Sequence, residues 1–239
     1  MGLLYIGVPY YGYGLDPTYL LVLIGAILTM AASAKVNATY AKYKKVRSHS
    51  GMTGAQAAEY ILHQAGIYDV KIQRVSGDLT DYYHPGKRTL HLSDSVYDNP
   101  SVAAIGVAAH ECGHAIQHAT HYAPLGLRSA IVPAVNICSK ASWPVLLLGM
   151  LLSWNHTLLV LGIVLFSVSV FFSLLTLPVE FNASSRALKI LGQTGLLQQD
   201  EKKQAKRVLS AAAMTYVAAA ASMILQLLRL VLLFGRDRD

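Results

Sequence analysis

Charged residues are scarce in this chain of 239 residues, and long stretches contain none. Asp, Glu, Lys and Arg make up 14% of the residues and hydrophobic residues 54%, a balance too apolar for an ordinary soluble domain. The segments 18–34, 157–179 and 210–228 contain no charged side chain and no histidine. Since a membrane-spanning helix needs about 20 mostly apolar residues, each segment is long enough to cross a bilayer.

Cysteine is also scarce, because the chain has only Cys112 and Cys138. One lies in a histidine-containing motif and the other in an apolar segment, which excludes a small domain held together by disulfides and favours a reducing compartment. Positive charge is missing from residues 1–17. A cleaved secretory signal needs a positive region before its apolar core, so we expect the first apolar segment to remain as an anchor.

The basic residues give a formal net charge of +7, but they lie beside apolar segments and form no nucleic-acid-binding motif. Anionic lipid headgroups and the positive-inside rule account for these positions and place both basic clusters in the cytoplasm. We therefore expect a lipid bilayer as partner and no nucleic acid. The clusters are Lys35, Lys42, Lys44, Lys45 and Arg47, and Arg186, Lys189, Lys202, Lys203, Lys206 and Arg207.

A fourth apolar segment, residues 129–153, is interrupted by Lys140, Pro133 and Pro144. It predicts a kinked span or a helix that only dips into the membrane, and we count it as a span. The loop at 154–156 and the N-terminal residues, which then share the other side of the membrane, carry no Lys or Arg.

Four spans place the polar segments on one side of the membrane. The expected order is span 18–34, cytoplasmic portion 35–128, span 129–153, span 157–179, cytoplasmic helix 178–208 and span 210–234. The predicted fold is a mainly α-helical integral membrane protein in one domain, 1–239, with about four transmembrane helices and a small α+β portion.

Local signals predict the elements of that portion. Thr53 can cap a helix that runs to about Gln64, and the segment 70–75 reads as a strand. Two further apolar stretches flank Pro85 and Gly86, where proline followed by glycine favours a type II turn and therefore a hairpin over residues 79–92.

A second helix leads directly into a catalytic motif. Ser101 can cap it, and the following apolar run ends in the sequence His110-Glu111-Cys112-Gly113-His114. Residues four apart lie on one face of a helix, so His110 and His114 can bind one zinc ion. Glu111 is turned about 100° from His110 and is placed to act as general base towards the water that zinc activates.

A catalytic zinc needs a third protein ligand and an open position. His118 lies too far along the helix from His110 to share the ion, and His121 stands one position beyond the metzincin spacing. Glu180 follows Pro178, at an expected helix start where the third span emerges. It could serve as the ligand, or it could simply favour a helix N-terminus through the macrodipole.

These residues carry a family resemblance that spans nearly the whole chain. The motif helix, the later run Leu-Pro-Val-Glu180-Phe-Asn182-Ala-Ser184 and the Tyr-Gly-rich start at residues 10–14 resemble the YugP-like family of neutral zinc metallopeptidases. More distantly, the pattern is similar to the membrane protease HtpX and the CAAX prenyl proteases. The resemblance implies Zn²⁺ held by His110, His114 and Glu180, with Glu111 catalytic. It also implies that the α+β portion is zincin-like and that the protein lies in a bacterial plasma membrane, with the site facing the cytoplasm.

One position departs from the wider group, which commonly has Asp four residues after the glutamate ligand. Ser184 stands there, and it or Asn182 can hydrogen-bond a ligand instead. His118, His91 and Arg186 are further candidates for supporting the site or contacting the substrate, and the spacing does not choose an oxyanion donor among them.

The expected function is zinc-dependent endopeptidase activity on membrane or membrane-proximal polypeptides, with an extended substrate bound along the hairpin. One alternative is an inactive scaffold or chaperone-like membrane protein that retains a metal. A structural zinc is usually closed by four ligands, and only three are evident. Another alternative, an ion transporter, would concentrate charges within its spans, where only Lys140 and Arg229 occur.

Overall fold

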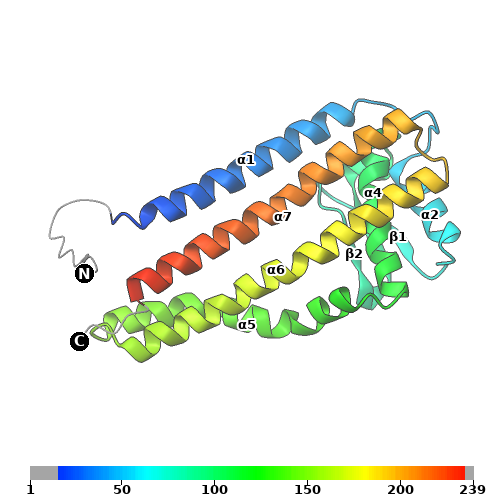
Figure 1. Ribbon diagram of the computed structural model, residues 1–239. Coiled ribbons are helices and arrows are strands. Elements are labelled where there is room, and N and C mark those ends of the chain that lie inside the picture. Colours follow the sequence, from blue (N-terminus) through cyan, green and yellow to red (C-terminus); the bar gives the residue numbers. More distant parts are fainter. Residues whose placement is uncertain (1–15, 235–239) are drawn as a thin grey trace, which may run out of the picture.

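The computed structural model describes residues 16–234 and consists of a long helical bundle with a small α+β unit at one end (Figure 1). The bundle contains α1 (Tyr19–Tyr43), α5 (Ala123–Leu151), α6 (His156–Gln193) and α7 (Gln199–Phe234). The smaller unit contains α2 (Gly54–Gln64), β1 (Lys71–Val75), β2 (Tyr82–His84), a 3-10 turn (Pro85–Lys87), β3 (Thr89–Ser93), α3 (Asp94–Tyr97) and α4 (Val102–Ala119).

Among the described residues, the four bundle helices are long and apolar enough to cross a membrane, which confirms the predicted fold class. At 1.5 Å per residue, α6 and α7 are each roughly 55 Å long, whereas a bilayer core is about 30 Å thick. Both helices therefore extend well beyond the apolar layer. Their extensions reach the α+β unit, so both bundle helices can contribute side chains to that unit (Figure 1).

Proline does not break the bundle helices. Pro133 and Pro144 lie inside α5, which is one continuous helix that packs along α6. Pro178 lies inside α6, so the expected helix start before Glu180 is wrong, and Glu180 occupies a helix interior. Neighbouring helices can satisfy the backbone groups that proline frees, which explains the continuity. The macrodipole explanation for Glu180 consequently fails.

The α+β unit follows the predicted elements closely. Thr53 and Gln56 form a capping box at the start of α2, as expected. The sheet has the order β1-β3-β2, in which β2 and β3 are antiparallel and β1 and β3 are parallel, so the hairpin is confirmed. The type II turn is wrong, because a 3-10 turn follows His84 and the positive φ of 47° falls on Arg88 instead of Gly86.

Helix α4 forms the centre of the smaller unit. Ser101 Oγ accepts a hydrogen bond from the amide of Ala104, which confirms the predicted cap. The first two turns of α4 are built mainly from small apolar residues that are fully buried, and the helix packs against α2, α6 and α7. This burial fixes the position of the motif that follows in the same helix.

Residues 198–203 at the start of α7 are charged or amide residues and most are exposed, but Glu201 is an exception. Glu201 is only 1% exposed, and its carboxylate accepts hydrogen bonds from the amides of His49 and Gln198. A buried carboxylate needs such donors, and here they join the loop after α1 to the first turn of α7. Hydrophobic periodicity alone does not reveal this contact.

Candidate metal centre

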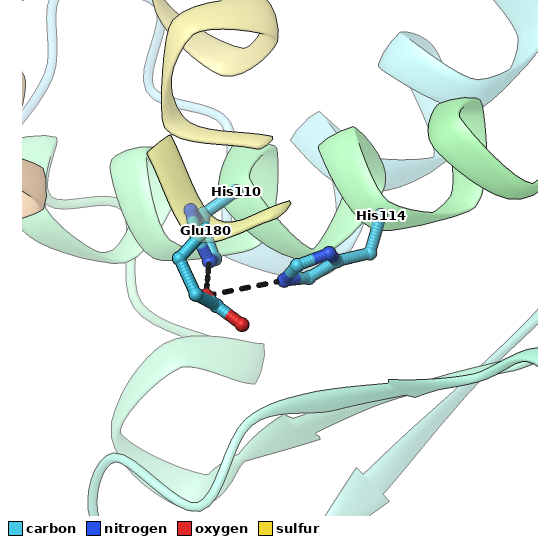
Figure 2. Close-up of side chains that lie close together, drawn as sticks. All are labelled: His110, His114 and Glu180. Atoms are coloured by element: carbon cyan, nitrogen blue, oxygen red, sulfur yellow. Dashed lines mark hydrogen bonds and ion pairs between the residues drawn. The ribbon is translucent and has the colours of Figure 1, made fainter. Parts of the chain in front are cut away.

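Helices α4 and α6 bring His110, His114 and Glu180 together (Figure 2). The Nε2 atoms of His110 and His114 lie 3.2 and 3.5 Å from Glu180 Oε2. One potential ligand atom from each residue lies within 4.8 Å of the other two. Glu180 and His114 are buried, at 3% and 9% exposure, so the group is held by the core and not by a mobile surface.

Gln117 determines how His114 presents its ring. Gln117 Nε2 donates to the carbonyl of Val179 at 2.8 Å and to Asn182 Oδ1 at 3.0 Å, which leaves Gln117 Oε1 as an acceptor. That oxygen lies 3.0 Å from His114 Nδ1, so Nδ1 carries the proton. In the neutral ring, His114 Nε2 is then the unprotonated nitrogen, and it faces Glu180.

His110 is held in a similar way by α6. Its Nδ1 atom lies 3.1 Å from Ser184 Oγ, one helical turn beyond Glu180. A serine hydroxyl can accept the Nδ1 proton, which directs the Nε2 lone pair towards Glu180. Ser184 therefore contacts one histidine where the wider group of proteases commonly has an aspartate.

The donor set fits a zinc ion. Two imidazole nitrogens and a carboxylate oxygen converge within a buried site, and three such acceptors repel one another unless a cation lies between them. Although burial lowers the pKa of His114, Glu180 and Glu111 raise it above its ordinary value, so the site favours positive charge. Two histidines with one carboxylate form a ligand set that catalytic zinc uses, with a fourth position open.

Glu111 lies beside this group but points into a cavity. The cavity has a volume of about 230 Å³ and is lined by His110, Glu111 and Glu180 together with apolar side chains of α1 and α7. Burial raises the pKa of Glu111 above its ordinary value, although the neighbouring histidines oppose that rise. A carboxylate of raised pKa in a cavity is suited to taking up and releasing a proton.

Glycine at position 113 lets the two helices that carry the candidate ligands touch. A Cβ atom there would lie 2.6 Å from the carbonyl oxygen of Ala183, closer than any real contact. Glycine is the one residue without a Cβ atom, so α4 and α6 approach at the turn that carries His110, His114 and Glu180. The second variable position of the motif therefore has a structural role of its own.

The other predicted residues lie around this centre at different distances. Asn182 accepts from Gln117 and from Arg186 Nε, so both belong to the network behind His114. His118 Nδ1 lies 2.9 Å from the hydroxyl of Tyr83, and His91 stacks on Tyr82, with ring centroids 4.4 Å apart. Neither histidine belongs to the three-residue group, nor does His121 in the turn after α4.

Three further residues at the site escaped the sequence analysis. Gln117 could have been suspected from its position three residues after His114 on the same helix face. Arg128 Nη1 lies 3.4 Å from Glu180 Oε1, and Tyr216 lines the cavity from α7. These two come from distant helices without a recognisable motif, so spacing offered no signal for them.

Comparisons with known proteins identify a family and a relative of this chain. A family described as "Putative neutral zinc metallopeptidase" matches residues 18–235. The chain is 49% identical over 212 residues to "Putative membrane protease YugP" of Bacillus subtilis (strain 168), which covers 89% of this chain and 94% of that protein. No solved structure matches.

Proposed function

Because this chain belongs to the neutral zinc metallopeptidase family, we propose that it is a membrane-integral endopeptidase that cleaves membrane or membrane-proximal polypeptides. The observation that carries the proposal is the convergence of His110, His114 and Glu180 beside the buried carboxylate of Glu111. His110, His114 and Glu180 would hold the zinc ion. Zinc bound there would lower the pKa of water towards about 7 and polarise a peptide carbonyl.

The protein's own groups would perform the proton transfers. The Glu111 carboxylate accepts a proton from the attacking water and later donates it to the nitrogen of the leaving amine. Gln117 and Ser184 hold the two imidazole rings in the orientation that leaves each Nε2 free. The apolar walls of the cavity exclude bulk water, which strengthens charge interactions inside.

The position of the cavity supports the proposed substrate class. Val36 of α1 and Val208, Leu209 and Ala212 of α7 line it, and both helices are candidate membrane spans. A polypeptide that leaves the bilayer beside these helices would meet the cavity that Glu111 lines. Strand β2 is the edge strand that lies nearest α4. Its free edge can form main-chain hydrogen bonds with an extended substrate.

The active site would face the cytoplasm. The α+β unit, the end of α6 and the start of α7 lie at one end of the bundle (Figure 1), where both basic clusters are found. The positive-inside rule assigns such an end to the cytoplasm. The opposite end carries the α5–α6 loop.

The test is a pair of measurements on the purified full chain. We expect about one zinc per chain and chelator-sensitive cleavage of an unfolded polypeptide. Glu111→Gln should keep the zinc but lower cleavage about 100-fold or more, because general acid–base catalysis contributes about 10²–10⁴. Glu59→Gln, which changes an exposed glutamate of α2, is the matched control. Undiminished cleavage by Glu111→Gln would reject the mechanism, and an unaltered protein that binds zinc but cleaves nothing would favour the scaffold.

The ligand set needs a separate test. Glu180→Ala should weaken zinc binding, as measured by competition with a fluorescent chelator, whereas Glu59→Ala should not. Unchanged affinity in Glu180→Ala would remove Glu180 from the ligand set and leave the histidine pair without its third partner.

A further inference from the structure

A groove on the bundle surface, separate from the metal centre, is lined by five cations. It lies between α1 and α7 and has a volume of about 700 Å³. The cations are Lys35 and Lys42 of α1 and Lys203, Lys206 and Arg207 of α7. No acidic side chain lines it. The groove therefore presents a concentrated positive charge at the end of the bundle that carries the α+β unit.

Helical spacing places these cations on facing sides of the two helices. Lys35 and Lys42 are seven residues apart, and Lys203 lies three and four residues before Lys206 and Arg207, so each set shares one helix face. Helices α1 and α7 run side by side (Figure 1). The cavity at Glu111 is lined by different residues of the same helices, so the groove and the catalytic cavity are two distinct sites.

The charge of the groove has no internal counterion. In the part of the chain that the structure describes, none of these five cations forms an ion pair with a carboxylate. Arg207 Nη1 instead donates to the hydroxyl of Tyr43 at 2.9 Å, which fixes the guanidinium at the groove wall. Like charges that line one groove repel one another, and an anion bound among them relieves the repulsion.

An apolar surface continues from the groove along the bundle. Ala38, Ala211 and Met214 line the groove itself, and Met214 is 45% exposed. Further along α1, Leu28 lies seven residues before Lys35 on the same helix face and is 42% exposed, as expected for a side chain that faces lipid. A ligand that suits this surface has an anionic head at the lysines and a hydrocarbon tail along the helices.

We propose that this groove binds the headgroup of an anionic phospholipid, with its acyl chains lying against α1 and α7. The headgroup phosphate would sit among Lys35, Lys42, Lys203, Lys206 and Arg207. Basic pockets between spans on the cytoplasmic side of a membrane are suited to such headgroups. The site is independent of the proposed peptidase activity, since it uses none of the residues at the metal centre.

The test is native mass spectrometry of the full chain, titrated with phosphatidylglycerol or with phosphatidylcholine of the same acyl chains. We expect phosphatidylglycerol to bind with defined stoichiometry and to outlast phosphatidylcholine on collisional activation. The double variant Lys203→Gln, Lys206→Gln should bind phosphatidylglycerol about 30-fold more weakly. The control Lys71→Gln, Lys87→Gln removes the same charge from exposed positions around the sheet and should bind as the unaltered protein does.

The remaining outcomes each decide against the proposal. Equal binding of both lipids, or unchanged phosphatidylglycerol affinity in the Lys203, Lys206 variant, would overturn the site. A further titration with inorganic phosphate distinguishes binding of a phospholipid headgroup from binding of free phosphate. If free phosphate displaces the phospholipid at equal concentration, the groove is a general anion site and the lipid assignment fails. Thermal melting of both variants verifies that each is folded.

Discussion

Two hydrogen bonds decide which nitrogen atoms of the motif histidines face the metal centre. His114 Nδ1 bonds Gln117 and His110 Nδ1 bonds Ser184, so both Nε2 atoms converge on Glu180. Supporting residues of this kind orient metal ligands and raise their basicity. The His-Glu-x-x-His motif supplies two candidate ligands, and these neighbouring residues orient them.

At the scale of single residues, Gln117→Ala should lower zinc affinity about 10- to 100-fold, because His114 loses the acceptor that fixes its tautomer. Competition with a fluorescent chelator measures the change. Gln117→Glu keeps an acceptor oxygen and should recover part of the affinity. Gln73→Ala, on the exposed side of β1, is the control. If Gln117→Ala melts earlier yet binds zinc as tightly as the unaltered protein, Gln117 has only a packing role.

At the scale of elements, the contact between α4 and α6 builds the site. The histidines lie on α4 and Glu180 on α6, and Gly113 permits their approach. Continuity of α6 through Pro178 matters equally, since one rigid helix carries Glu180, Asn182 and Ser184 from the bundle into the α+β unit. If a separate helix began at this point, the position of Glu180 relative to the bundle would be less well defined.

Gly113→Ala should therefore damage the site although it changes no ligand. The added methyl group meets the backbone of Ala183, which cannot move cheaply, and such overpacking costs about 1–3 kcal/mol. We expect weaker zinc binding together with a lower melting temperature. Gly126→Ala is the matched control, because a Cβ atom there meets nothing within 4 Å. Equal zinc affinity in both variants would show that the helix contact does not set the ligand geometry.

At the scale of the whole molecule, the bundle places the α+β unit at one end and the α5–α6 loop at the other (Figure 1). If the site is cytoplasmic, a cysteine at Thr157 should react with a membrane-impermeant maleimide in intact cells. A cysteine at Lys71 should react only after lysis. Cys138→Ser provides the background, since Cys112 is buried and burial raises the pKa of its thiol. Reversed labelling would place the metal centre outside the cytoplasm.

The sequence by itself determined the fold class and the motif helix. Long apolar segments are visible because a membrane demands a minimum apolar length, and HExxH is visible because its chemistry depends on local helical spacing. The helix caps at Thr53 and Ser101 also depend only on local sequence, and both predictions are confirmed. A pattern confined to one helix can be recognised in the sequence because it does not depend on contact with a distant segment.

Only the tertiary structure shows which residues surround the candidate ligands. Gln117, Arg128 and Tyr216 come together from three helices, and the buried role of Glu201 depends on a loop about 150 residues away. Proline suggested a helix break at residue 178, but packing against neighbouring helices overrode that preference. The sequence proposed Glu180 as the third ligand through its family resemblance, but only the tertiary structure shows its carboxylate beside the two histidines, where α6 approaches α4 at Gly113.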